Sequence, residues 1–181
     1  MSNLDKSFAF VMAVESIREK KKVISELSKK DKKERGYSRF DRETPDKIVS
    51  KMLELAEITS RNLTFLEPSA GRGAIAKYLT CYDLDIVEIN DQCREYLQKE
   101  GFFVVGCDFL EYQGEYDRII MNPPFTKNQD VKHILHAYEC LNPGGILVSV
   151  APSNITLKEY ALNKLLRHLN PEIIKLPDGS F

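Results

Sequence analysis

The spacing of apolar residues along this 181-residue chain changes at about residue 60. Before that point, apolar residues recur every three or four positions, which is typical of one face of a helix. Beyond it, short uninterrupted apolar runs alternate with helix-like stretches. Short continuous apolar runs are typical of strands buried on both faces of a parallel sheet. The pattern therefore predicts a helical first part followed by an alternating α/β part.

Six apolar runs predict strands, and the stretches between most of them predict helices. The expected strands are residues 63–66, 83–87, 102–105, 118–121, 146–150 and 173–176. The expected helices are residues 45–59, 75–79, 90–101, 130–141 and 156–168. For the first of these, Thr44 suits the N-cap and Pro45 the first helical position. Strands alternating with helices predict a doubly wound, mostly parallel sheet with helices on both faces.

The first 36 residues are predicted to form a charged helical extension to a domain that spans residues 37–181. An imperfect apolar stripe supports the helix, formed by Phe8, Val11, Met12, Ile17, Val23, Ile24 and Leu27. Lysines gather at residues 20–22, 29–30 and 32–33. The preferred interpretation of these lysines is a helix face in contact with solvent. The alternative is that these lysines contact the phosphates of a nucleic acid.

Composition and charge argue against a strongly basic protein, a disulfide-rich protein and a membrane protein. The net charge of −1 gives no overall field that attracts nucleic acid, so any basic surface must be local. The four cysteines form no C-x-x-C pair, and three of them lie in or beside predicted core elements, which predicts reduced, buried thiols. There is no apolar stretch of membrane-spanning length and no signal-peptide pattern, so a cytoplasmic protein without a membrane partner is expected. His133 and His136 are interpreted as surface residues, because no third metal ligand lies nearby in the sequence.

A glycine-rich turn follows the first predicted strand, in the sequence Glu67-Pro-Ser-Ala-Gly-Arg-Gly73. Gly71 and Gly73 allow a tight turn and let a ligand approach the backbone. Glu88 ends the next strand and is placed to accept hydrogen bonds from ribose hydroxyls. Together they predict a cofactor that contains adenosine. Glu67 would repel a pyrophosphate, which favours a cationic ligand group beside the turn.

A second motif, Asn122-Pro-Pro-Phe125, follows the fourth predicted strand. The prolines must end that strand, and Pro123 favours an extended backbone at Asn122. The asparagine amide is therefore expected at a strand tip, with an aromatic ring three residues further on. This order suits a nucleobase whose exocyclic amine is held by the amide and whose ring stacks on Phe125. Asp108 and Phe109, after the third strand, are placed to bind the amine and ring of the cofactor's adenine.

In this order and spacing, the four motifs resemble those of class I S-adenosylmethionine-dependent methyltransferases, and more narrowly the N6-adenine DNA amino-methylases. The resemblance covers roughly residues 40–150. It implies a Rossmann-like methyltransferase fold and S-adenosylmethionine as the cofactor. The family's sheet has seven strands, so the six expected here imply that the last strand is missing. No target-recognition region is visible between Phe125 and the fifth strand.

The resemblance also implies roles for the motif residues. The segment around Thr44 closes over the cofactor, the glycine turn holds its methionine portion, and the Asn122–Phe125 motif holds the target base. The implied cofactor-binding residues are Thr44, Pro45, Glu67, Pro68, Ser69, Ala70, Gly71, Gly73, Glu88, Ile89, Asp108, Phe109 and Asn122. The implied catalytic residues are Asn122, Pro123, Pro124 and Phe125.

The first hypothesis for function is methyl transfer from S-adenosylmethionine to an exocyclic amine of a nucleobase, with adenine N6 in DNA as the target. An RNA methylase acting on adenine or guanine amines is an alternative. Methylation of a glutamine amide in a protein is another alternative, but enzymes of that kind usually carry tyrosine at the position of Phe125. A non-catalytic subunit that binds nucleic acid or a partner, and an NAD-dependent oxidoreductase, are further alternatives. Target choice is expected from sequence that is missing, from a separate target-recognition subunit, or from the lysine-rich extension.

Overall fold

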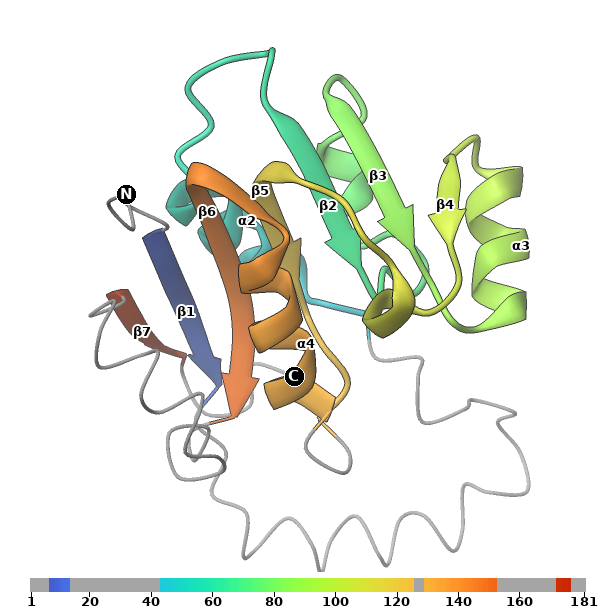
Figure 1. Cartoon of the computed structure of the whole chain (residues 1–181). Coiled ribbons are helices and arrows are strands. Elements are labelled where there is room, and N and C mark those ends of the chain that lie inside the picture. Colours follow the sequence, from blue (N-terminus) through green and yellow to red (C-terminus); the bar gives the residue numbers. More distant parts are fainter. Residues whose placement is uncertain (1–6, 14–42, 126–128, 153–171, 177–181) are drawn as a thin grey trace, which may run out of the picture.

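The computed structural model describes residues 7–13, 43–125, 129–152 and 172–176. Within them, seven strands form one sheet in the order β4-β3-β2-β5-β6-β1-β7. Every neighbouring pair of strands is parallel. The predicted parallel sheet is therefore confirmed (Figure 1).

The elements alternate along most of the chain, as expected. The strands are β1 (Ser7–Ala13), β2 (Thr64–Pro68), β3 (Asp83–Val87), β4 (Val104–Gly106), β5 (Tyr116–Met121), β6 (Leu141–Pro152) and β7 (Glu172–Leu176). The helices are α2 (Asp46–Leu55), α3 (Asp91–Lys99) and α4 (Gln129–Glu139), with short 3-10 helices η1 (Ala76–Tyr78) and η2 (Phe109–Glu111).

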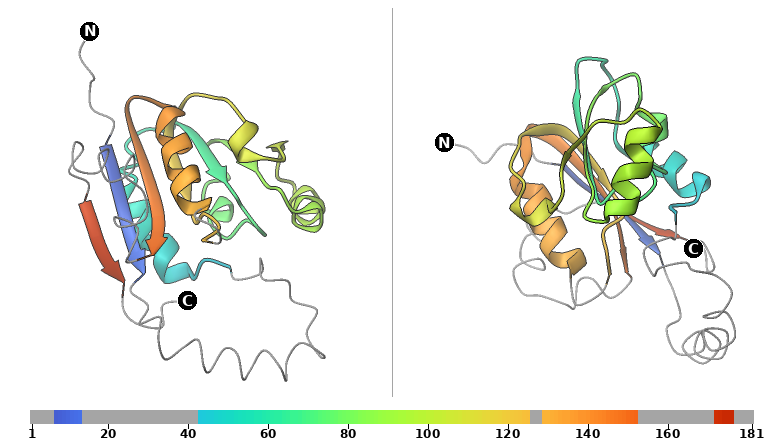
Figure 2. Two further views of the ribbon diagram at one scale, coloured as in Figure 1. Left: turned by 60° about the horizontal axis from the view of Figure 1, so that its bottom comes forward. Right: turned by 90° about the vertical axis from the view of Figure 1, so that its right-hand side faces the viewer.

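Helices cover both faces of the sheet, as predicted. Successive residues of β5 show this, because neighbouring side chains of a strand point to opposite faces. Ile119 packs in one core cluster with Ile134 of α4. The next residue, Ile120, packs in a second cluster with Met52 of α2. The right-hand view of Figure 2 shows α4 and α2 on opposite sides of the sheet.

The expectation of six strands is wrong, because β1 lies within the segment predicted to be helical. β1 inserts between β6 and β7, pairing with Ile146–Pro152 on one side and Glu172–Leu176 on the other. Ser7–Ala13 is a short run without charged residues, in which strand and helix spacing cannot be told apart. Pairing with the edge of the sheet at β6 favours the strand over a helix. The rest of the predicted extension, including its lysines, lies outside the described residues.

The start of α2 also differs from the prediction. Pro45, with extended backbone, occupies the N-cap position, and Thr44 lies one residue before it. The carbonyl of Pro45 accepts hydrogen bonds from the N–H groups of Ile48 and Val49, at 2.8 and 3.0 Å. The side chain of Thr44 is buried and makes a different hydrogen bond, described below.

The helix predicted over residues 75–79 is only the 3-10 turn η1. Gly71 and Gly73 have φ angles of +57° and +79°, so the chain before η1 is a turn and not helical. The short connection that remains before β3 gives too few residues for a stable helix. β6 begins at Leu141, earlier than the strand predicted over residues 146–150. The helix predicted over residues 156–168 lies outside the described residues.

Candidate functional site

The two sequence motifs meet where the order of the strands reverses. The chain runs outward from β2 through β3 to β4, and then returns to the other side of β2 as β5. In parallel α/β sheets, ligands bind outside the carboxyl ends of the strands at such a reversal. β2 leads into the glycine turn and β5 leads into Asn122. The candidate site is therefore at the lower edge of the sheet in Figure 1.

The glycine turn leaves space beside its backbone. A Cβ atom added to Gly71 would meet no atom within 4 Å, whereas one added to Gly73 would lie 2.9 Å from Cδ2 of Leu97. Gly73 therefore permits close packing on α3, and Gly71 keeps open space beside a strained turn. Ser69, with φ of +66°, also donates its N–H to the carbonyl of Val87 at 2.8 Å. This hydrogen bond ties the turn to the end of β3.

Glu67 is a buried carboxyl group with an unused acceptor. Its side chain is 2% exposed, and Oε2 has no hydrogen-bond partner among the described residues. Burial raises its pKa well above the usual value, and nearby Glu88 raises it further, against the hydrogen bonds from the backbone at Ala76 and Ile75. An unpaired buried acceptor beside a second carboxylate is suited to a cationic or hydrogen-donating ligand group.

Glu88 joins the glycine turn to the start of α3 through both of its carboxylate oxygens. Oε2 accepts the N–H of Gly71 at 2.6 Å, and Oε1 accepts the N–H of Asn90 at 2.7 Å. The side chain is 6% exposed. These bonds fix the carboxylate at the carboxyl end of β3, the position that the sequence predicts for a ribose-binding residue. Ile89, which follows it, is 63% exposed.

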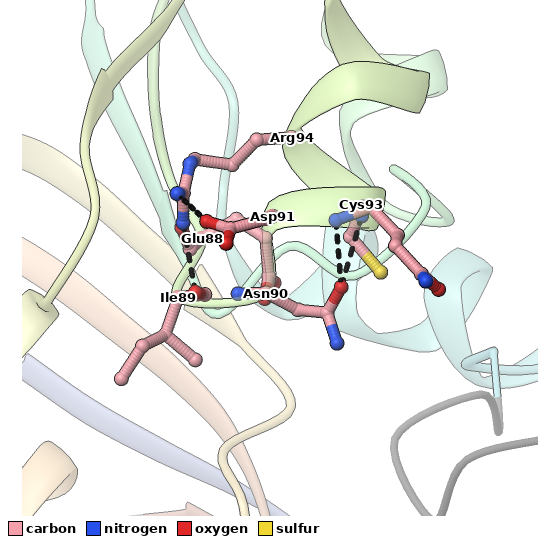
Figure 3. Close-up of polar contacts among 7 residues, drawn as sticks. Glu88, Ile89, Asn90, Asp91, Cys93 and Arg94 are labelled. Atoms are coloured by element: carbon pink, nitrogen blue, oxygen red, sulfur yellow. Dashed lines mark hydrogen bonds and ion pairs between the residues drawn. The ribbon is translucent and has the colours of Figure 1, made fainter.

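Arg94 and Asn90 support this turn, and the sequence analysis did not include them in the site (Figure 3). Nη1 of Arg94 donates to the carbonyl oxygens of Glu88 and Ile89, at 2.9 and 2.7 Å. The same guanidinium pairs with Asp91. Oδ1 of Asn90 caps α3 by accepting two backbone N–H groups. Asn90 begins the helix predicted over residues 90–101, but no sequence signal marks an arginine that binds carbonyls in a neighbouring turn.

Phe109, predicted to pack on the cofactor's adenine, is buried against α4. Its ring is 2% exposed and lies against His133 and His136 of α4, with ring centroids 5.4 and 4.8 Å away. Oδ1 of Asp108, the other residue predicted to bind adenine, caps η2 by accepting the N–H of Leu110 at 2.9 Å.

Of the two histidines expected at the surface, His133 is buried and the side chain of His136 is 20% exposed. His133 is 7% exposed, and its Nδ1 donates to the carbonyl of Gln129 at 2.8 Å. Nε2 of His136 donates to the carbonyl of Tyr112 at 2.7 Å. Burial lowers the pKa of His133. Both rings therefore help to pack α4 against η2.

The amide of Asn122 has one atom in use and one unused. Nδ2 donates to the hydroxyl of Thr44 at 3.0 Å, while the buried Oδ1 has no hydrogen-bond partner among the described residues. Pro123 is buried, and the ring of Phe125 is 42% exposed. The predicted arrangement, an acceptor followed by an accessible aromatic ring, is thus present at the end of β5.

The described part of the chain shows neither a cluster of metal ligands nor a helix suited to a membrane. It holds no group of three or more His, Cys, Asp or Glu side chains suited to a metal ion. None of its helices combines the length and the apolar character needed to cross a membrane. The four cysteines form no disulfide, and two of them, Cys81 and Cys107, are exposed and not buried as expected.

Comparison with known proteins identifies one matching family. The family model described as "Methyltransferase small domain" matches residues 74–173. No curated protein matches the chain. The solved structure of the N-methyltransferase NodS from Bradyrhizobium japonicum WM9 is similar in fold, with a TM-score of 0.52 and 17% identity. That match covers 71% of this chain and 83% of NodS.

Two more solved structures match the chain at low identity. Geranyl diphosphate methyltransferase in complex with SAM matches with a TM-score of 0.50 and 12% identity, covering 72% of this chain and 59% of that one. Coclaurine N-methyltransferase matches with a TM-score of 0.47 and 20% identity, covering 56% of this chain. The chain spans 33% of the length of that enzyme. The likenesses to NodS and to geranyl diphosphate methyltransferase support the Rossmann-like methyltransferase fold expected from the sequence.

Proposed function

Because this chain belongs to the methyltransferase small domain family, we propose that it methylates an exocyclic amine of a nucleobase, with adenine N6 in DNA as the first candidate. The observation that carries the proposal is the unused Oδ1 of Asn122 beside Pro123 and the exposed ring of Phe125. The proposed methyl donor is S-adenosylmethionine, and the proposed partner is a nucleic acid.

The residues at the end of β2 fit this cofactor. The cofactor carries a cationic amino group, which suits the unpaired Oε2 of Glu67. The open space beside Gly71 leaves room for a ligand against the backbone. Glu88, fixed by two N–H groups, retains lone pairs that can accept ribose hydroxyls. When bound, S-adenosylmethionine supplies an electrophilic methyl group on its sulfonium.

Residues of this chain can increase the nucleophilicity of an exocyclic aryl amine. Its lone pair is delocalised into the ring, so it is a poor nucleophile. In the proposed mechanism Oδ1 of Asn122 and the carbonyl of Pro123 accept the two amine hydrogens, which favours a pyramidal nitrogen. Phe125 stacks on the base and fixes its plane. Alignment and hydrogen bonding then provide much of the acceleration without a strong general base. A base in duplex DNA must first be flipped out.

The test is methyl transfer from labelled S-adenosylmethionine to separate pools of DNA, RNA and protein, followed by nucleoside analysis. The proposal predicts label in nucleic acid, as N6-methyladenine in DNA. Label in RNA as methylated adenine or guanine would support the RNA alternative. Label confined to protein, or absent from all pools while NADH binds, would contradict the proposal. Adding candidate partner proteins tests whether a separate subunit selects the target.

A further inference from the structure

A side-chain amide has two chemically opposite ends. In Asn122, Oδ1 can only accept a hydrogen bond, and Nδ2 can only donate. Rotation about the last side-chain torsion exchanges them, and this torsion is broad and nearly two-fold. An amine hydrogen is attracted to Oδ1 and repelled by the Nδ2 hydrogens. The proposed role of Asn122 therefore requires a device that keeps Oδ1 directed at the target.

Thr44 is in position to be that device. Its Oγ1 accepts a hydrogen bond from Nδ2 of Asn122 at 3.0 Å, across 78 residues of sequence. This is the bond that occupies the donor end of the amide and leaves Oδ1 without a partner among the described residues. In the reverse arrangement the hydroxyl would donate to Oδ1, and Nδ2, which cannot accept a hydrogen bond, would face the amine.

Thr44 is held firmly enough to orient another residue. It is 6% exposed, and Pro45 joins it directly to α2. The first turn of α2 is anchored in the core by Ile48 and Val49, which are 4% and 0% exposed. A buried hydroxyl fixed to a core helix keeps its place when the neighbouring amide rotates.

We infer that Thr44 is a positioning residue for methyl transfer: by accepting a hydrogen bond from Nδ2, it holds the Asn122 amide with Oδ1 toward the target amine. This inference rests on the proposed function and goes beyond the cofactor contact that the resemblance implies for Thr44. It makes the start of α2 part of the apparatus that activates the amine.

The hydrogen bond can be tested without any activity. In nitrogen-15-labelled protein, a side-chain amide proton of Asn122 should exchange with water more slowly than those of the exposed Asn62. The difference should disappear in Thr44→Val, which keeps the shape and removes the hydroxyl, and should remain in Thr44→Ser. Rapid exchange in the wild type, or protection unchanged in Thr44→Val, would overturn the inference whether or not the protein is a methylase.

The catalytic consequence is tested in single turnover at saturating S-adenosylmethionine, with the nucleic acid that the wild type methylates. Thr44→Val should lower the rate about tenfold, the upper range for one hydrogen bond. Thr44→Ser should restore most of it, and the exposed control Thr59→Val should leave it unchanged.

A double-mutant cycle separates positioning from an independent cofactor contact. If Thr44 acts through Asn122, adding Thr44→Val to Asn122→Ala should lower the rate no further. A further tenfold loss in the double variant would contradict the inference while leaving the proposed function intact. Absence of methyl transfer by the wild type to any pool would instead contradict the proposed function, and the exchange experiment would still decide the geometry.

Discussion

Glu88 offers a perturbation whose size can be worked out from the structure. Its carboxylate accepts the N–H groups of Gly71 and Asn90, at 2.6 and 2.7 Å. Hydrogen bonds to charged groups contribute about 1.5–3 kcal/mol each when buried. Both hydrogen bonds are only partly buried, so in a variant without the carboxylate, water can form part of the lost hydrogen bonding. Glu88→Ala should therefore lower the free energy of unfolding by about 2–3 kcal/mol, measured by urea denaturation.

The same variant should weaken cofactor binding by more than loss of stability explains. Losing the hydrogen bonds to ribose hydroxyls should cost about 1.5–3 kcal/mol, or about 10- to 150-fold in dissociation constant. Calorimetry with S-adenosylhomocysteine, the demethylated product, measures this at a temperature where the variant is folded. Glu95→Ala, an exposed glutamate on α3, is the matched control and should change neither quantity. A stability loss with unchanged cofactor affinity would refute the ribose role of Glu88.

Two more predictions concern pH and salt. Because the pKa of Glu67 is raised in the folded state, the unfolded chain loses this proton first, so stability should fall as pH rises above about 4.5. Glu67→Gln mimics the protonated acid and should flatten this fall in urea denaturation at a series of pH values, and an unchanged pH dependence would contradict the raised pKa. If the lysines of residues 20–33 contact phosphates, replacing them by glutamine should flatten the salt dependence of nucleic-acid binding. An unchanged salt dependence would favour the interpretation of these lysines as a solvated helix face. The lysines should be replaced and not removed by deleting residues 1–35, because that deletion also removes β1.

The position of the site could be predicted from sequence because local chemistry determines it. Prolines at 123 and 124 end β5 whatever surrounds them, and Gly71 and Gly73 mark a turn that most other residues disfavour. Since the carboxyl ends of parallel strands share one edge, locating the strand ends was enough to predict that the two motifs lie at the same edge of the sheet. The capping of α3 by Asn90 was predictable for the same local reason.

Features that depend on distant parts of the chain were not predictable. Ser7–Ala13 became a strand because an edge of the sheet was open beside β6. The contacts of the Phe109 ring with His133 and His136 of α4 join residues that are far apart in the sequence, so local patterns could not predict them. Thr44 resembled a helix cap in sequence, and only the fold showed that its hydroxyl bonds Asn122. Each outcome depends on packing and not on local preference.

The measurement that tests the account most directly is the single-turnover rate of Asn122→Ala on the nucleic acid that the wild type methylates. Oδ1 strengthens its hydrogen bond as positive charge develops on the amine, so it favours the transition state over the ground state. We expect the rate to fall about a hundredfold or more, as for loss of one preorganised polar partner, with cofactor affinity within about twofold. Asn62→Ala, on the exposed surface, should retain the wild-type rate. A wild-type rate in Asn122→Ala would contradict the account, because the Asn122–Phe125 motif would then only end a strand.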